Sequence, residues 1–428
     1  MPDKIRVLSV CTSDSFGGAA IAAYRIHLAV RSFGVEGKMF VKKKGTKDKT
    51  VVALQEFVPR NPFYKAFDWI RNRFKNKWQH LLWSRYSERS DFFMSDLRST
   101  DICNALKKID YDILHLHWIN SRFLPLSCLP KDKPIVWTLH DCWPFCGVCH
   151  YFLDCNQYMS GCGRCPHLKS GEQNDLSRMI IRKKERVYNN LDLHIVAPSK
   201  WIGQCAKDSY LFHNRKITVI PNCVDPELFR PLPESCLQPK VQSLKAVFGE
   251  KSIIMFGAVN ATTDRIKGIG KLVEALRIIC ESHQADQLAL VIFGTDRPVE
   301  GIPAGIQTNY VGYLKDSFEF VSLYSIASVV VVPSYTEVFG QVAAEAMACG
   351  TPVTVFRCTG IQEVVDDSCG YLARPFDASD LAKGILWCLE NNKDGHLSRN
   401  ARRKVLENFT PEIVGKHYFE LYSSLLKR

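Results

Sequence analysis

Two glutamates in the stretch SYTEVFGQVAAEAMACGTPV, residues 334 to 353, have the type and spacing to bind a polar ligand. Glu345 follows Glu337 by eight positions, and a helix that begins early places the carboxylates about 12 Å apart along its axis. That distance is too long for acid and base work on one bond, but it suits two hydroxyl-bearing rings joined by a diphosphate. Glu345 lies in the apolar run AAEAMAC, so its carboxylate needs a partner. The N–H groups near Gly340 and Gln341 can face the phosphates, because a helix N-terminus favours anions.

Cations and glycines follow two of the apolar runs in the chain. In SIIMFGAVNATTDRIKGIGKLVEAL, residues 252 to 276, Arg265 and Lys267 lie in the loop before a predicted helix. Two cations there can neutralise a diphosphate leaving group, although an ordinary basic helix start fits equally well. Near the N-terminus, Gly17 and Gly18 separate a strand from a helix, where backbone N–H groups can approach a phosphate. Simple turn geometry is the alternative for this glycine pair.

Six of the 17 cysteines fall in HDCWPFCGVCHYFLDCNQYMSGCGRCPHL, residues 140 to 168. Four thiolates at this spacing predict a closed structural zinc site, whereas a catalytic zinc needs an open position and usually His or carboxylate ligands. Cys142, Cys146 and His150 are further candidate ligands, and free thiols in a compact loop are the alternative. The four predicted ligands are Cys149, Cys155, Cys162 and Cys165.

Strands that alternate with helices must position these residues. Short runs rich in Val, Ile and Leu recur with helical segments between them, which is typical of parallel sheets covered on both faces. A Pro-rich stretch, residues 225 to 240, reads as an interdomain linker. We therefore predict an α/β fold with two doubly wound, Rossmann-like domains that face a central cleft. The apolar runs are Ile5–Cys11, Ile113–Trp118, Ile135–Leu139, His194–Ala197, Ile217–Ile220, Ile253–Gly257, Leu288–Gly294, Val329–Val332 and Pro352–Phe356.

Length and charge limit the class of protein. A chain of 428 residues is long enough for two domains, and it has no apolar run of the ~20 residues that span a bilayer. The N-terminus has no export signal, so we expect a cytoplasmic protein whose cysteines are mostly free thiols or metal ligands. The net charge of +12 predicts an anionic partner, which is a nucleic acid, a phosphorylated small molecule or an acidic membrane surface.

Residues 60 to 89 carry eight Lys or Arg, two acidic residues and eight aromatics. An amphipathic helix of this composition suits an anionic membrane surface. The alternatives are a stripe that packs on the first domain and, less favoured, a surface that stacks on single-stranded nucleic acid. The residues at helical spacing are Phe63, Phe67, Ile70, Phe74 and Trp78.

Taken together, the motifs resemble those of the retaining glycosyltransferases of family 4, which have the GT-B architecture. The resemblance runs along nearly the whole chain, and the Glu337 and Glu345 pair with the GTPV that follows is its specific part. A WPF…CHY…CG.CP stretch after HD is similar to that of colanic-acid glycosyltransferases. The other motifs are the FGGA turn, LHD at 139–141, APSKW at 197–201, VIPNCVD at 219–225, the KG at 267–268, GIQEVV and GYLARPFD.

The resemblance implies a role for each motif residue. Glu345 would hold the ribose of a nucleotide sugar, and Glu337 would touch the donor sugar beside the backbone of Phe339 and Gly340. Lys267 would bind the diphosphate together with Arg265. The other implied contacts are Gly17 and Gly18 on the phosphates, Gln341 at the helix start, His140 near the donor sugar and acceptor, and Gly312, Tyr313 and Leu314 near the base.

The implied mechanism uses no protein nucleophile and needs no cofactor. The acceptor hydroxyl attacks on the face that the nucleotide leaves, so the protein positions the substrates and stabilises charge on the leaving group. The family often has an arginine directly after the glycine of the second domain's first strand. Here Ala258 occupies that position, and our hypothesis is that Arg265 substitutes for it.

The domains implied are residues 1–225 on the acceptor side, with insertions at 60–95 and 142–168, residues 226–408 for the donor, and a helix at 409–428 that packs back on the first domain. We expect transfer from a UDP- or GDP-sugar to a glycan or lipid-linked glycan in polysaccharide biosynthesis, at the inner face of the cytoplasmic membrane. The alternatives are an inactive nucleotide-sugar-binding scaffold, a nucleotide-sugar epimerase and a zinc-dependent nucleic-acid binder. We do not expect a nucleic acid as a partner.

Overall fold

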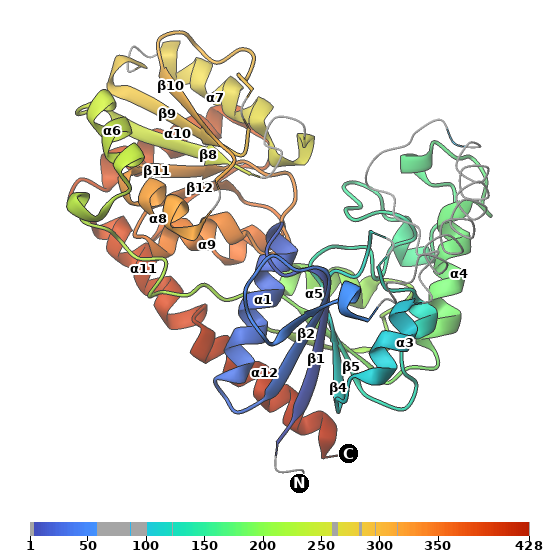
Figure 1. The fold of residues 1–428 in the computed structure, drawn as a ribbon. Helices are drawn as coiled ribbons and strands as arrows, with labels where there is room; N and C mark the ends of the chain where they lie inside the picture. The colour runs from blue at the N-terminus through green and yellow to red at the C-terminus, as the bar shows by residue number, and fades with distance from the viewer. Residues whose placement is uncertain are drawn as a thin grey trace, which may run out of the picture. The chain divides into compact units, whose positions relative to one another are not determined.

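The chain folds into two compact units in a computed structural model that describes residues 4–57, 86, 101–121, 123–258, 264–281, 285–295, 297–314 and 316–427 (Figure 1). Unit 1 comprises Met1–Pro198, Ile202–Ile220 and His417–Arg428, and unit 2 comprises Ser199–Trp201 and Pro221–Lys416. The predicted membrane-binding insertion, residues 60–95, lies outside the described residues except for Tyr86.

A seven-stranded parallel sheet forms the centre of unit 1, in the order β3-β2-β1-β4-β5-β6-β7. β4, β5 and β6 are buried along their whole length, as expected for strands covered on both faces. The strand order reverses between β1 and β4, so the loops after these strands diverge at the carboxyl edge, where such sheets bind ligands. The strands are β1 (Arg6–Ser13), β2 (Glu36–Lys43), β3 (Val51–Ala53), β4 (Ile113–Leu116), β5 (Ile135–Thr138), β6 (Leu193–Ala197) and β7 (Lys216–Val219).

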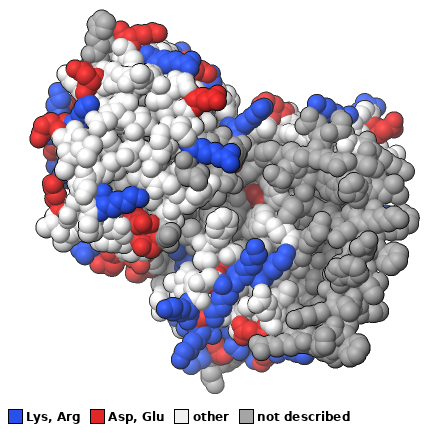
Figure 2. Space-filling model, turned by 45° about the horizontal axis from the view of Figure 1, so that its top comes forward, with Lys and Arg blue, Asp and Glu red and all other residues white. Residues whose placement is uncertain are grey.

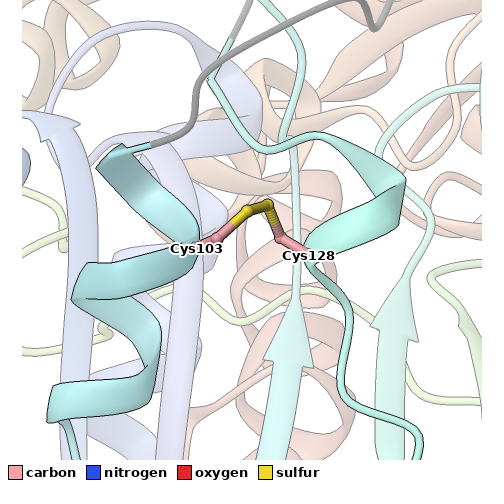
Figure 3. The surroundings of a disulfide bond; sticks show 2 residues. All are labelled: Cys103 and Cys128. Carbon is pink, nitrogen blue, oxygen red and sulfur yellow. A yellow bond between two sulfur atoms is a disulfide. The ribbon is translucent and has the colours of Figure 1, made fainter.

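The helices of unit 1 connect these strands. Those described are α1 (Gly18–Arg31), α3 (Asp101–Lys108), α4 (Leu176–Tyr188) and α5 (Lys200–Asp208), with short 3₁₀ turns η1 (Leu54–Glu56), η2 (Leu126–Cys128), η3 (Gln157–Ser160) and η4 (Pro166–Leu168). A disulfide joins Cys103 of α3 to Cys128 at the end of η2 (Figure 3). The sequence did not predict this pairing, because spacing alone does not place α3 beside η2.

Unit 2 has a six-stranded parallel sheet in the order β10-β9-β8-β11-β12-β13. Alternate residues of its strands enter two apolar clusters: Met255 and Val330 lie in one, and Ile254 and Val331 lie in the other. This alternation shows that both faces of the sheet are covered. The strands are β8 (Ser252–Gly257), β9 (Leu288–Phe293), β10 (Gln307–Gly312), β11 (Val329–Val332), β12 (Val353–Phe356) and β13 (Gly370–Ala373).

The helices of unit 2 include a final helix that the two units share. They are α6 (Pro239–Phe248), α7 (Ile269–Glu281), α8 (Ser317–Ile326), α9 (Gln341–Ala348), α10 (Ala378–Asn391), α11 (His396–Asn408) and α12 (Pro411–Leu426), with η5 (Glu234–Cys236), η6 (Arg265–Lys267), η7 (Ala285–Gln287) and η8 (Gly360–Glu363). From His417 onward α12 belongs to unit 1. There the hydroxyl of Tyr418 bonds Thr138 (2.8 Å) and that of Tyr422 bonds His115 (2.6 Å). Within the described ranges, no helix has the length and apolar character to cross a membrane.

Candidate functional site

Two predicted site residues of unit 2 meet directly. The Lys267 ammonium donates to Oε1 of Glu337 at 2.8 Å, and the Ser334 hydroxyl donates to the same oxygen at 3.0 Å. Both charged side chains keep about a fifth of their surface exposed, at 21% and 20%. The site therefore offers a cation and a carboxylate that are oriented by one another and still accessible to a ligand.

The loop before α7 is fixed in place by close backbone contacts. Asp264 caps η6 by accepting from the Ile266 N–H (3.0 Å), and Tyr335 N–H donates to Ile266 O (2.8 Å). Gly268 has φ +73°, and a Cβ at this position would stand 1.9 Å from the Pro333 carbonyl oxygen. Only glycine allows this approach, which brings Lys267 beside the β11 end of the sheet.

Arg265 lies in the same turn with an exposed side chain. It lies two residues before Lys267 in the sequence, but the structure does not tie it to the Lys267 and Glu337 pair.

The start of α9 is also shaped by a glycine. Gly340 caps the helix with φ +104°, and Ile361 would lie 2.6 Å from a Cβ there. The Phe339 side chain is buried against Phe409 (ring centroids 5.3 Å), so only its backbone is available to a ligand. The Gln341 amide donates to the Cys223 carbonyl at 3.4 Å.

Glu345 lies inside the core of unit 2, with 7% of its surface exposed. The Tyr324 hydroxyl of α8 lies 3.4 Å from its Oε2 and can donate to it. A carboxylate this deeply placed needs hydrogen-bond donors, and ligand hydroxyls supply such donors.

The predicted base contacts near β10 are less enclosed. Tyr313 is 54% exposed, Gly312 faces open space, and Leu314 lines a groove with Val241 and Leu244 of α6.

The glycine turn of unit 1 leaves room for a ligand. Gly17 has φ +88° and caps α1, and no atom lies within 4 Å of a Cβ built on Gly17 or Gly18. Asp14 holds the neighbouring lysine-rich loop by accepting from Gly45 N–H (2.7 Å) and the Thr46 hydroxyl (2.6 Å). Burial acts to raise the pKa of Asp14, but these hydrogen bonds lower it below its ordinary value.

His140 belongs to a group of three histidines at the ends of β4 and β5. His117 Nδ1 lies 3.0 Å from His140 Nε2, and the rings of His115 and His117 have centroids 4.1 Å apart. Burial lowers the pKa of His140 to about 4 and that of His115 to about 3, and it also lowers the pKa of His117 well below its ordinary value. All three rings are therefore neutral near pH 7. The sequence analysis proposed only His140 from this group.

Asp141, which follows His140, forms hydrogen bonds with residues of the Cys-rich segment. The sequence did not predict this role. Its carboxylate accepts from the Trp118 indole (2.7 Å) and from the Trp143 backbone N–H (3.0 Å), and it contacts His150 Nδ1 at 2.5 Å. The carboxylate is 5% exposed, so these bonds replace water.

The predicted zinc site remains a prediction, and its four cysteines are not gathered into a metal-binding group in this structure. Over the described ranges, no three or more His, Cys, Asp or Glu are grouped so as to hold a metal ion. Burial raises the pKa of Cys155, and it raises the pKa of Cys162 and Cys165 to about 12, while a hydrogen bond with Cys146 lowers that of Cys149. None of these four cysteines forms a disulfide.

A buried lysine from α4 organises the segment instead. The Lys184 ammonium is fully buried, donates to the carbonyl oxygens of Trp143 and Cys146, and lies 3.6 Å from the Trp143 ring centroid. The ammonium binds the loop through its carbonyl groups, and burial lowers its pKa to about 8.

Comparison with known proteins gives two adjacent family matches. The model for Glycosyltransferase Family 4 matches residues 17–228, and that for Glycosyl transferases group 1 matches residues 245–404. A D-inositol 3-phosphate glycosyltransferase from Corynebacterium jeikeium is 29% identical over 295 residues, which cover 65% of this chain and 64% of the relative. The alignment thus spans less than two thirds of that relative.

Two further proteins place the match in context. A protein described as a colanic acid biosynthesis glycosyl transferase, WcaC from Escherichia coli, is 23% identical over 274 residues, covering 61% of this chain and 62% of the relative. HepE from Anabaena, solved in complex with UDP-glucose, shares the fold with a TM-score of 0.63 at 16% identity, covering 98% of this chain and 100% of that chain.

Proposed function

Because the chain belongs to the GT-B glycosyltransferases, with a family 4 domain followed by a group 1 domain, we propose that it transfers a sugar from a nucleotide-sugar donor to an acceptor hydroxyl. The observation that carries the proposal is the pairing of Lys267 with Glu337 near the start of α9, with the buried Glu345 on the same helix. This set combines a cation for a diphosphate with carboxylates for sugar hydroxyls.

The proposed donor is a UDP- or GDP-sugar, held by unit 2. Lys267 neutralises charge on the departing diphosphate, and Glu337 both orients Lys267 and accepts from a hydroxyl of the transferred sugar. Glu345 accepts from the ribose hydroxyls. The bound UDP-glucose of HepE supports a nucleotide-sugar donor for this fold.

The proposed reaction retains the anomeric configuration. The acceptor oxygen bonds to the anomeric carbon on the face from which the phosphate oxygen departs, and the acceptor proton passes to that phosphate. The chain's contribution is to position both substrates and to stabilise the leaving group, which removes the need for a protein nucleophile.

The proposed acceptor is a glycan or a lipid-linked glycan of polysaccharide biosynthesis. The net charge of +12 supports an acceptor or surface that carries negative charge. Figure 2 shows Lys and Arg side chains gathered in the lower middle of the visible face. In unit 1, the loop after β2 exposes Lys43, Lys44 and Lys47.

Calorimetry tests donor binding first. UDP, GDP, ADP and their sugars are titrated into the wild type, Glu345→Ala and Glu407→Ala, the last being an exposed glutamate of α11. One nucleotide class should bind the wild type and Glu407→Ala equally and bind Glu345→Ala at least about tenfold more weakly, as expected when a charged hydrogen-bond acceptor is lost. Equal binding to all three proteins would contradict the role of Glu345.

Turnover tests the rest of the proposal. Lys267→Ala should lose transfer, and NMR of the product should show the anomeric configuration of the donor. An inverted product would reject retention. Arg265→Ala should also slow transfer if Arg265 replaces the arginine missing at Ala258, and full activity of this variant would reject that substitution.

A further inference from the structure

The histidine pair at the ends of β4 and β5 is built from two neighbouring strands. β4 and β5 are parallel neighbours, so His117, the first residue past β4, and His140, the second residue past β5, leave the sheet at the same edge. His117 is 2% exposed and His140 is partly buried, and their rings stack with centroids 5.2 Å apart and an interplanar angle of 25°. The 3.0 Å contact between His117 Nδ1 and His140 Nε2 is therefore a fixed feature of the sheet edge.

Only one proton can lie between these two nitrogens. Because both rings are neutral, one nitrogen donates and the other accepts. If His140 donated, His117 would have to carry its own proton on Nε2. That atom is buried and has no hydrogen-bond partner among the residues the structure describes. A buried N–H without an acceptor is costlier than a buried lone pair, so the proton belongs on His117 Nδ1.

The surroundings hold His117 in this orientation. The ring of His115 lies against it, and His115 is itself fixed at Nδ1 by Tyr422 (2.6 Å) and at Nε2 by Thr138 (2.8 Å). The Trp137 indole donates to the His117 carbonyl oxygen at 3.0 Å. Both the ring and the backbone of His117 are thus held in place by neighbouring residues of unit 1.

We propose that His117 is a positioning residue for His140: its Nδ1–H donates to His140 Nε2 and thereby fixes the neutral His140 tautomer that carries its proton on Nδ1. His140 then presents an N–H donor to a hydroxyl oxygen of a sugar substrate. The second step rests on the proposed function, whereas the choice of tautomer does not.

Substitutions that keep or remove a hydrogen-bond donor at the position of His117 Nδ1 separate positioning from packing. The Asn amide nitrogen can occupy the place of His Nδ1, whereas the Gln amide reaches the place of Nε2. His117→Asn should therefore keep the donor to His140, and His117→Phe should remove it while filling the volume. His194→Gln is the matched control, since His194 is a buried histidine of β6 whose Nε2 bonds Thr218 (2.8 Å).

Two-bond ¹H–¹⁵N correlation spectra of the imidazoles read the tautomer directly. We expect His140 to be protonated on Nδ1 in the wild type, His117→Asn and His194→Gln, and to shift toward the Nε2 tautomer in His117→Phe. Protonation on Nε2 in the wild type, or an unchanged tautomer in His117→Phe, would overturn the proposal. This measurement needs no substrate, so it remains decisive even if sugar transfer is never observed.

Kinetics tests the link to the reaction. His117→Phe should lower kcat/KM by about 10- to 100-fold, the range expected when a substrate-contacting group is misplaced, and His117→Asn should restore most of it. In a His140→Ala background, His117→Phe should have no further effect on kcat/KM, because its action passes through His140. Additive losses in the double variant would assign His117 a merely structural role.

Discussion

Acid should destabilise this protein well above the pH at which carboxylates titrate, because unit 1 buries neutral histidines. Burial lowers the pKa of His27 and His140 to about 4 and that of His115 to about 3, and it also lowers the pKa of His117 well below its ordinary value. In the unfolded chain these imidazoles take up protons near pH 6.5. The unfolded state therefore binds more protons than the native state below that pH, and the free energy of unfolding falls as the pH drops toward 4.

The magnitude follows from the difference in proton uptake. Between pH 7.5 and pH 5.5, each histidine that stays neutral in the native state lowers the free energy of unfolding by about 1.4 kcal/mol. Four such histidines together lower it by about 5 kcal/mol. That is a large part of the roughly 5 to 15 kcal/mol by which a typical domain is stable. Carboxylates with lowered pKa, such as Asp14 and Asp112, lose their contribution only near and below their unfolded value of 3.8. The interval from pH 7.5 to 5.5 therefore isolates the histidines.

Urea unfolding at pH 7.5, 6.5 and 5.5 measures this effect, with hydrogen exchange of β4 and β5 peptides as the probe of unit 1. His27→Gln keeps a group that can bond Thr50, as His27 Nε2 does at 2.9 Å, and it should reduce the pH-dependent loss by about 1.4 kcal/mol. His396→Gln, at a histidine whose side chain keeps 44% of its surface exposed, serves as the matched control. A flat stability across this pH interval would refute the burial of neutral imidazoles.

Three further substitutions test individual contacts by urea midpoint. Gly268→Ala should destabilise unit 2 by about 3 kcal/mol or more, since its φ is +73° and the Pro333 carbonyl blocks a Cβ, whereas Gly270→Ala in the open first turn of α7 should be neutral or slightly stabilising. Equal effects would show that the approach to Pro333 is not needed. Lys184→Met should cost about 3 kcal/mol, because it leaves buried carbonyl groups without a donor, and an unchanged midpoint would remove Lys184 as the organiser of the Cys-rich segment. Cys103→Ala should cost about 3 kcal/mol under oxidising conditions and much less with a reductant present, and a loss independent of reductant would assign the effect to packing.

The central strands were predictable because they are apolar along their whole length. Val329–Val332 is β11, and Ile135–Thr138 of the predicted run 135–139 is β5. The two edge strands of unit 2, β10 and β13, were not predicted. β10 has no fully buried residue, and β13 begins with Gly370, so neither shows the apolar run on which the prediction relied. With the family match, the predicted GT-B fold class is confirmed.

The candidate site was predictable where function constrains neighbouring sequence. Lys267 and Glu337 were both proposed from their loops, and the structure joins them at 2.8 Å. The contacts of His117 and Asp141 were missed, because they depend on strand register. A signal was present, since LHLHW and TLHD each place a histidine just after an apolar run. The zinc site stays a prediction for a related reason: spacing fixes how far apart cysteines are in sequence but not the path of the chain between them.

The division of α12 between the units has a consequence for biosynthesis. Unit 1 uses residues up to Ile220 and then again from His417, so the ribosome must add roughly 200 residues before this domain has all its parts, which takes about 10 to 40 s. During that time Tyr418 and Tyr422 are not yet available to cover Thr138 and His115. Until then, Thr138 and His115 of the nascent first domain would lack their tyrosine partners and would be accessible to chaperones. The first domain would therefore finish folding only after the second domain has been synthesised.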